Sequence, residues 1–177
     1  TPNMLNYEDT YRDFRLEVPE FFNFGFDVVD RWAEDRTKLA LISLDPTGQQ
    51  AQQHTFWDLK VQSNRFANVL REIGVAKGER VLVMLPRIPQ WYAVLLGLMK
   101  IGAVPMPTTT LCTPRDIEYR LVQAEATLAI TDQENAGKVE EAAGNCASLK
   151  TLMVVDGSKR GWVGYEERMD KASSKLE

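Results

Sequence analysis

The stretch RVLVMLPRIPQWYAVLLGLMKIGAVPMP, residues 80–107, decides the fold. Residues 80–86 are apolar at nearly every position, which is typical of a central parallel strand that is buried on both faces. Residues 89–101 are apolar around almost the whole circumference of a helix, and this predicts a buried helix. A short strand follows at residues 103–107. A strand, a covering helix and a second strand together form the repeating unit of a parallel sheet.

The same alternation continues on both sides of this stretch. Before it, the sequence predicts a helix from Phe22, a strand at 39–44, a turn at 45–50, and a helix that begins at Thr55 and ends at Gly74. After it, the sequence predicts a helix from Thr113, a strand at 128–131, a helix from Asp132 to about Ala143, a strand at 152–155, a loop at 156–161 and a helix at 165–172. This order predicts an α/β fold, with a mostly parallel sheet and helices on both faces.

The domain organisation follows from the same pattern. Residues 1–20 form an N-terminal arm, and residues 21–177 form one α/β portion. Tyr7, Tyr11 and Phe14 recur at helical spacing, so we expect them to dock the arm.

Composition and charge exclude several classes of function. The chain has 177 residues, 21 Lys and Arg against 25 Asp and Glu, and a net charge of −4, which argues against nucleic acid as the main partner. No apolar run approaches the ~20 residues of a membrane span, and the first residues resemble neither a signal nor a transit peptide. Cys112 and Cys146 lack zinc-site spacing, so we expect no metal site and a reduced compartment. The expected location is the cytoplasm, or the mitochondrial matrix if a leader has been removed.

Two loops carry the candidate site residues, because ligands of parallel sheets bind beyond the carboxyl ends of the strands. The first loop holds Arg87 between two prolines, where it can bind an anion or pin a carboxylate. The second holds Thr108, Thr109, Thr110 and Leu111, and its hydroxyls can line a polar cleft. A strand end followed by a helix cap explains the same threonines without a ligand. Both interpretations stay open on the residues alone.

The residues that most catalytic mechanisms need are not recognisable. There is no GxxxxGK[ST] or GxGxxG phosphate loop, and Gly157–Gly161 is interpreted as a surface turn. His54, the single histidine, is interpreted as an exposed loop residue, and Cys112 as a packing residue. Trp91 and Tyr92 are interpreted as core at the start of a buried helix. We therefore assign no catalytic residue and no metal ligand.

Longer stretches carry a resemblance to a known family. They are FFNFGFDVVDRWAED (21–35), TFWDLK through DIEYRL (55–121) and LAITDQE (128–134). They resemble the N-terminal part of an AMP-forming acyl-CoA synthetase, in the adenylate-forming superfamily that also holds firefly luciferase. LPRIPQW (85–91) and MP followed by DIEYRL (116–121) are similar to signatures of the medium-chain fatty acyl-CoA synthetase branch.

The resemblance implies a two-step ligase that uses ATP, Mg²⁺ and coenzyme A. A carboxylic acid, expected to be a short- or medium-chain fatty acid, becomes an acyl-adenylate, and coenzyme A then displaces AMP. It also implies that the phosphate loop, the adenine-site motif, the ribose-binding Asp and the catalytic Lys lie beyond residue 177. The chain alone is therefore expected to be inactive and to hold none of these ligands tightly.

The resemblance also bears on the threonine loop. In the medium-chain branch the matching loop borders the entry of coenzyme A, where some members carry a glutamine; Leu111 stands at that position here. Two other hypotheses remain: a stand-alone, flavodoxin-like module that binds a small ligand without catalysis, and a fragment that self-associates through exposed apolar surface.

Overall fold

The computed structural model describes residues 5–176, and a five-stranded sheet forms its centre. The strands lie in the order β4-β3-β5-β6-β7, and every neighbouring pair is parallel. Their bounds are β3 Arg80–Met84, β4 Val104–Pro107, β5 Leu128–Asp132, β6 Thr151–Val155 and β7 Val163–Gly164. The predicted parallel α/β fold is therefore confirmed.

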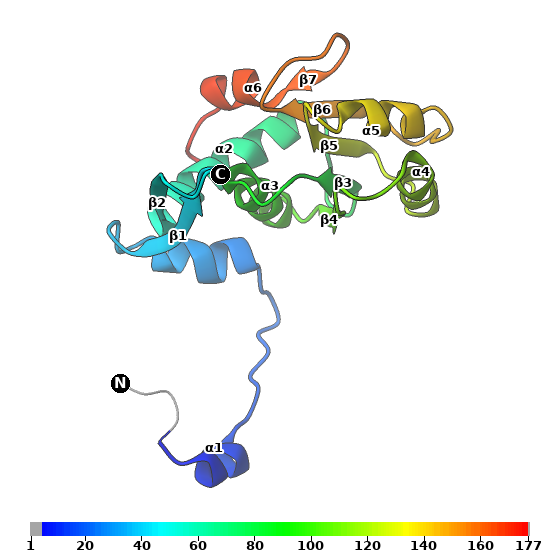
Figure 1. The fold of residues 1–177 in the computed structure, drawn as a ribbon. Coiled ribbons are helices and arrows are strands. Elements are labelled where there is room, and N and C mark those ends of the chain that lie inside the picture. Colours follow the sequence, from blue (N-terminus) through cyan, green and yellow to red (C-terminus); the bar gives the residue numbers. More distant parts are fainter. Residues whose placement is uncertain (1–4, 177) are drawn as a thin grey trace.

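Helices cover both faces of this sheet (Figure 1). On one face lie α2 (Phe56–Glu72), α3 (Pro89–Lys100) and α6 (Tyr165–Lys171); on the other lie α4 (Pro114–Gln123) and α5 (Ala136–Ala143). Alternate residues of β3 serve the two sides: Val81 and Val83 join the core under α2 and α3, whereas Leu82 and Met84 join the core under α4 and α5. All four side chains are fully buried, as the apolar run predicts.

A separate two-stranded antiparallel sheet precedes the main one. It consists of β1 (Leu39–Leu44) and β2 (Ala51–Thr55). The sequence predicts β1 and the turn between the strands but no strand at β2, because AQQHT carries no apolar alternation. The interpretation of His54 as an exposed loop residue was also wrong. His54 lies in β2, is half-buried, and has its Nε2 3.2 Å from Oγ of Ser43.

Two predicted helix starts differ from the structure. The first helix begins at Phe24 rather than Phe22, and its Gly25–Asp30 segment is a π-helix, η1. Helix α5 begins at Ala136 rather than Asp132. Asp132 is still paired with Val155 as the last residue of β5, and its Oδ1 accepts hydrogen bonds from the backbone and side-chain nitrogens of Asn135. The carboxylate therefore holds a turn instead of capping the helix.

The described part of the arm, residues 5–20, contains one short helix, α1 (Tyr7–Asp13), capped by Asn6. Tyr7 and Tyr11 stack on each other, with ring centroids 6.0 Å apart. Both rings and Phe14 are largely exposed, so the structure does not dock the arm through them as the helical spacing suggested. Figure 1 shows the arm extending away from the sheet.

Candidate functional site

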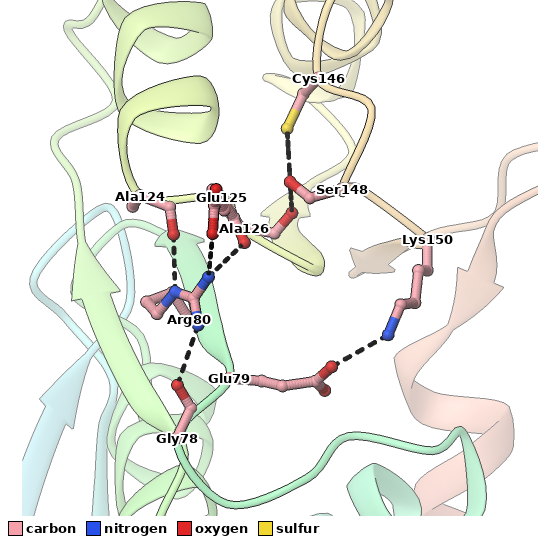
Figure 2. A network of polar contacts seen from close by, with 9 residues as sticks. All are labelled: Gly78, Glu79, Arg80, Ala124, Glu125, Ala126, Cys146, Ser148 and Lys150. Carbon is pink, nitrogen blue, oxygen red and sulfur yellow. Dashed lines mark hydrogen bonds and ion pairs between the residues drawn. The ribbon is translucent and has the colours of Figure 1, made fainter.

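The amino-terminal edge of the sheet is occupied by structural interactions (Figure 2). Arg80 donates from Nε to the carbonyl of Ala124 at 2.6 Å and from Nη2 to the carbonyl of Glu125 at 3.0 Å. Beside it, Nζ of Lys150 lies 3.0 Å from Oε1 of Glu79, and this contact contributes to the lowered pKa of the Glu79 carboxyl after the backbone hydrogen bond from Ala76. These contacts join the starts of β3, β5 and β6, so we place the candidate site at the opposite, carboxyl edge.

Arg87 follows β3 at this carboxyl edge. Its side chain is exposed, and it has no hydrogen bond or ion pair within the described residues. It borders a groove of about 330 Å³ between the β1–β2 hairpin and the start of α3, which His54 and Asp45 also line. The Asp45 carboxylate accepts hydrogen bonds from Gln50 and Thr47, which belong to the same turn, and these bonds lower the pKa of its carboxyl. The groove therefore carries the carboxylate of Asp45, held by its own turn, and the guanidinium of Arg87, which has no partner among the described residues.

The threonine loop follows β4, the neighbour of β3, so it shares this edge with Arg87. Thr108 is buried: its backbone N–H donates to the carbonyl of Val83 at 2.9 Å and its hydroxyl donates to the carbonyl of Met106 at 3.2 Å. The hydroxyl of Thr109 accepts from the backbone N–H of Leu111 at 3.3 Å. Two of the three hydroxyls thus hold the loop's own conformation.

Thr110 and Leu111 are the residues of this loop that remain available to a ligand. The half-buried Thr110 has a hydroxyl without a hydrogen-bond partner in the part of the chain that the structure describes. The Leu111 side chain is 87% exposed. Thr113 closes the loop as the N-cap of α4, in a capping box with Asp116. The loop is therefore a fixed turn that presents one hydroxyl and one apolar side chain.

An acidic group that sequence analysis did not find lies beyond β5 and β6. Asp156 follows β6, and its backbone N–H donates to Oε1 of Glu166 at 3.0 Å. Burial, and then the nearby charges of Glu166 and Asp132, raise the pKa of the Asp156 carboxyl. An Asp at the end of an apolar strand was the available signal. The carboxyl edge thus carries acidic side chains beyond β5 and β6 and the cationic side chain of Arg87 beyond β3.

Other predictions from the sequence concern single side chains. Cys112 is buried in the core with Ile117 and Leu121, which confirms the packing interpretation. Cys146 is also buried, with its Sγ 3.3 Å from Oγ of Ser148 (Figure 2). Residues 5–176 bring together no group of three His, Cys, Asp or Glu side chains suited to a metal ion. None of the helices among them combines the length and apolar character needed to cross a membrane.

A parallel sheet covered by helices on both faces, with hydrogen bonds and ion pairs along its amino edge, defines an α/β protein of the class whose ligands bind beyond the carboxyl ends of the strands. The particular family follows from comparison. The family model described as "AMP-binding enzyme" matches residues 28–175, so the chain belongs to this family.

Known proteins support this assignment along most of the chain. Acyl-coenzyme A synthetase ACSM3, mitochondrial, of Mus musculus is 36% identical over 97% of this chain and 31% of its own length. Acyl-coenzyme A synthetase ACSM5, mitochondrial, of Homo sapiens is 34% identical over 90% of this chain and 29% of its own length. The chain thus spans about a third of the length of these relatives.

Solved structures of two CoA ligases and of one acyl-CoA synthetase align with most of this chain. The anthranilate CoA ligase AuaEII, solved with anthranoyl-AMP, aligns with a TM-score of 0.78 and 25% identity, over 90% of this chain and 30% of that one. A benzoate CoA ligase from Burkholderia xenovorans LB400 aligns with a TM-score of 0.71 and 29% identity, over 86% of this chain and 29% of that one. A Brucella canis acyl-CoA synthetase, at 24% identity and a TM-score of 0.85, shares the fold over 97% of this chain and 33% of that one.

Proposed function

We propose that this chain is the first part of an AMP-forming acyl-CoA synthetase. The observation that carries the proposal is the 36% identity to an acyl-coenzyme A synthetase over 97% of this chain. The complete enzyme would join a carboxylic acid to the α-phosphate of ATP, with Mg²⁺, to give an acyl-adenylate and pyrophosphate. The thiol of coenzyme A would then attack the acyl carbon and release AMP. Short- and medium-chain fatty acids are the proposed substrates, in the mitochondrial matrix or the cytoplasm.

Within that enzyme, the described residues would supply a scaffold and one rim of the active site. ATP and coenzyme A are polyanions, so the free guanidinium of Arg87 suits the side of the sheet that faces them. Thr108, Thr109, Thr110 and Leu111 would form the rim toward coenzyme A. The hydroxyl of Thr110 is free to donate, and the exposed Leu111 offers apolar contact. No group among residues 5–176 is proposed as a general base or as a nucleophile.

Acid-dependent exchange of pyrophosphate into ATP tests the proposal. The complete polypeptide is supplied with MgATP and, in turn, with acids from butyrate to octanoate and with benzoate. It should exchange labelled pyrophosphate into ATP without coenzyme A. It should release AMP only when coenzyme A is added. The 177-residue chain should do neither. Absence of acid-dependent exchange by the complete polypeptide would overturn the ligase assignment, and exchange by the 177-residue chain would overturn its proposed inactivity.

A further inference from the structure

One lysine of α5 forms a hydrogen bond to the middle of the threonine loop, residues 108–111. Nζ of Lys138, on α5, donates to the backbone carbonyl of Thr110 at 3.0 Å, across 28 positions of sequence. Lys138 is half-buried, and no carboxylate within residues 5–176 forms an ion pair with it. The charged ammonium therefore donates to a neutral carbonyl instead of pairing with a carboxylate. A hydrogen bond from a charged donor is stronger than one between neutral groups.

The ends of the loop do not need this contact. At one end Thr108 is fixed to β3 through Val83, and at the other Cys112 is buried in the core and Thr113 caps α4. Between them, the hydrogen bonds of residues 109–111 other than the lysine contact are local: Thr109 accepts from the backbone N–H groups of Leu111 and Cys112. Lys138 is therefore the contact that fixes the middle of the loop to another element.

We infer that Lys138 is a positioning residue for the binding of coenzyme A. The inference rests on the proposed function, in which Thr110 and Leu111 form the rim toward that substrate. Lys138 acts through the loop and not on the reacting atoms. Its loss would free the carbonyl of Thr110 and let the exposed Leu111 leave its fixed position. The second half-reaction would suffer, while the adenylation of the acid would not.

The test uses the complete enzyme and separates the two half-reactions. K138M should raise the KM for coenzyme A roughly tenfold, because small displacements of positioning groups have large effects on rate and binding. The KM values for ATP and for the acid, and the pyrophosphate exchange measured without coenzyme A, should stay within about twofold, which is the range of a change remote from the chemistry. K138R, which keeps a charged donor, should recover most of the affinity for coenzyme A.

K150M is the matched control. Lys150 also donates to a single oxygen, of Glu79, but at the amino-terminal edge, so K150M should leave all these constants unchanged. If K138M does not yield folded enzyme, K138Q carries the same expectation. An unchanged KM for coenzyme A, an equal loss in both half-reactions, or no recovery in K138R would overturn the inference. A wild-type enzyme without acid-dependent exchange would instead overturn the proposed function, which is a separate result.

Discussion

Lys100 and Asp30 form an ion pair inside the protein, with Nζ 2.7 Å from Oδ1 and the lysine side chain fully excluded from solvent. The same ammonium donates to Oδ1 of Asn64 at 2.7 Å. Burial lowers the pKa of Lys100, and Asp30 opposes that shift. One ammonium thereby joins the π-helix η1, α2 and α3. Gly25 makes room for it, since a Cβ there would lie 2.7 Å from Cγ of Lys100.

Removing this lysine should destabilise the fold strongly. In K100M the carboxylate of Asp30, which is mostly buried, loses its cationic partner. Breaking a buried pair from one side costs about 3–5 kcal/mol of the free energy of unfolding. Urea unfolding followed by circular dichroism measures the loss. The double variant D30N/K100M should be more stable than K100M alone, because no charge is left buried, and equal instability of the two would contradict this explanation.

The close approach of α2 and α3 should make Gly97 intolerant of a methyl group. A Cβ at Gly97 would lie 2.8 Å from Cδ1 of Phe66 and 3.1 Å from the carbonyl of Ser63. G97A should therefore lose about 1–3 kcal/mol of stability through overpacking, despite the better helix propensity of Ala.

Gly137 provides the matched control for that substitution. It lies in α5, and a Cβ there would have no heavy atom within 4 Å. G137A should be neutral or stabilising by up to about 1 kcal/mol. Thermal unfolding of the two variants side by side distinguishes steric crowding from a general effect of Gly-to-Ala change; a stabilised G97A would show that the helices separate at little cost.

The capping boxes should make stability fall in acid. Hydrogen bonds from the hydroxyl and backbone N–H of Thr113 lower the pKa of Asp116 below 3.8, and those of Thr55 do the same for Asp58. The unfolded chain then binds more protons than the folded one, so the contribution is complete well above pH 3.8 and is lost as the pH falls through the folded pKa. D116N should flatten the dependence of urea midpoints on pH below about 5. An unchanged slope would mean that the box contributes nothing.

The structure also explains which parts of the fold could be predicted. Strand β3 was recognisable because Val81, Leu82, Val83 and Met84 are buried alternately on two faces, which leaves no polar position. Strand β2 was not, because its polar residues pair with β1 and most remain exposed. The local sequence shows which residues of a strand are buried, whereas it does not show which other strand it pairs with.

The candidate site also contains residues whose place follows from the local sequence and residues whose contacts depend on tertiary packing. Arg87 and the threonine loop were found because a residue that follows a parallel strand lies at the carboxyl edge, whatever its partners are. Lys138 was not found, since its contact with Thr110 depends on where α5 packs. Likewise, Lys100 is the last residue of an apolar helix, and its partners Asp30 and Asn64 come from the packing of η1, 70 positions away, and of α2, 36 positions away.

Leu111 should set part of the affinity for coenzyme A in the complete enzyme. Its exposed side chain cannot form hydrogen bonds, whereas the amide of a glutamine can donate and accept. L111Q should therefore lower the KM for coenzyme A by up to about fivefold, the equivalent of one net hydrogen bond. Steady-state kinetics with coenzyme A varied at saturating ATP and acid measure the change. An unaltered KM for coenzyme A would remove Leu111 from the rim.

The arm, together with Phe21 directly after it, should drive self-association of the 177-residue chain. Leu16, Val18 and Phe21 are each at least 77% exposed, and large exposed apolar surface promotes association. Light scattering should give a mass that rises with concentration above the 20.1 kDa of one chain. The triple variant L16S/V18S/F21S should stay closer to that mass, whereas L111S, which removes one exposed leucine outside the arm, should behave as the wild type. A wild-type chain of constant mass would show that the arm is compatible with a monomer.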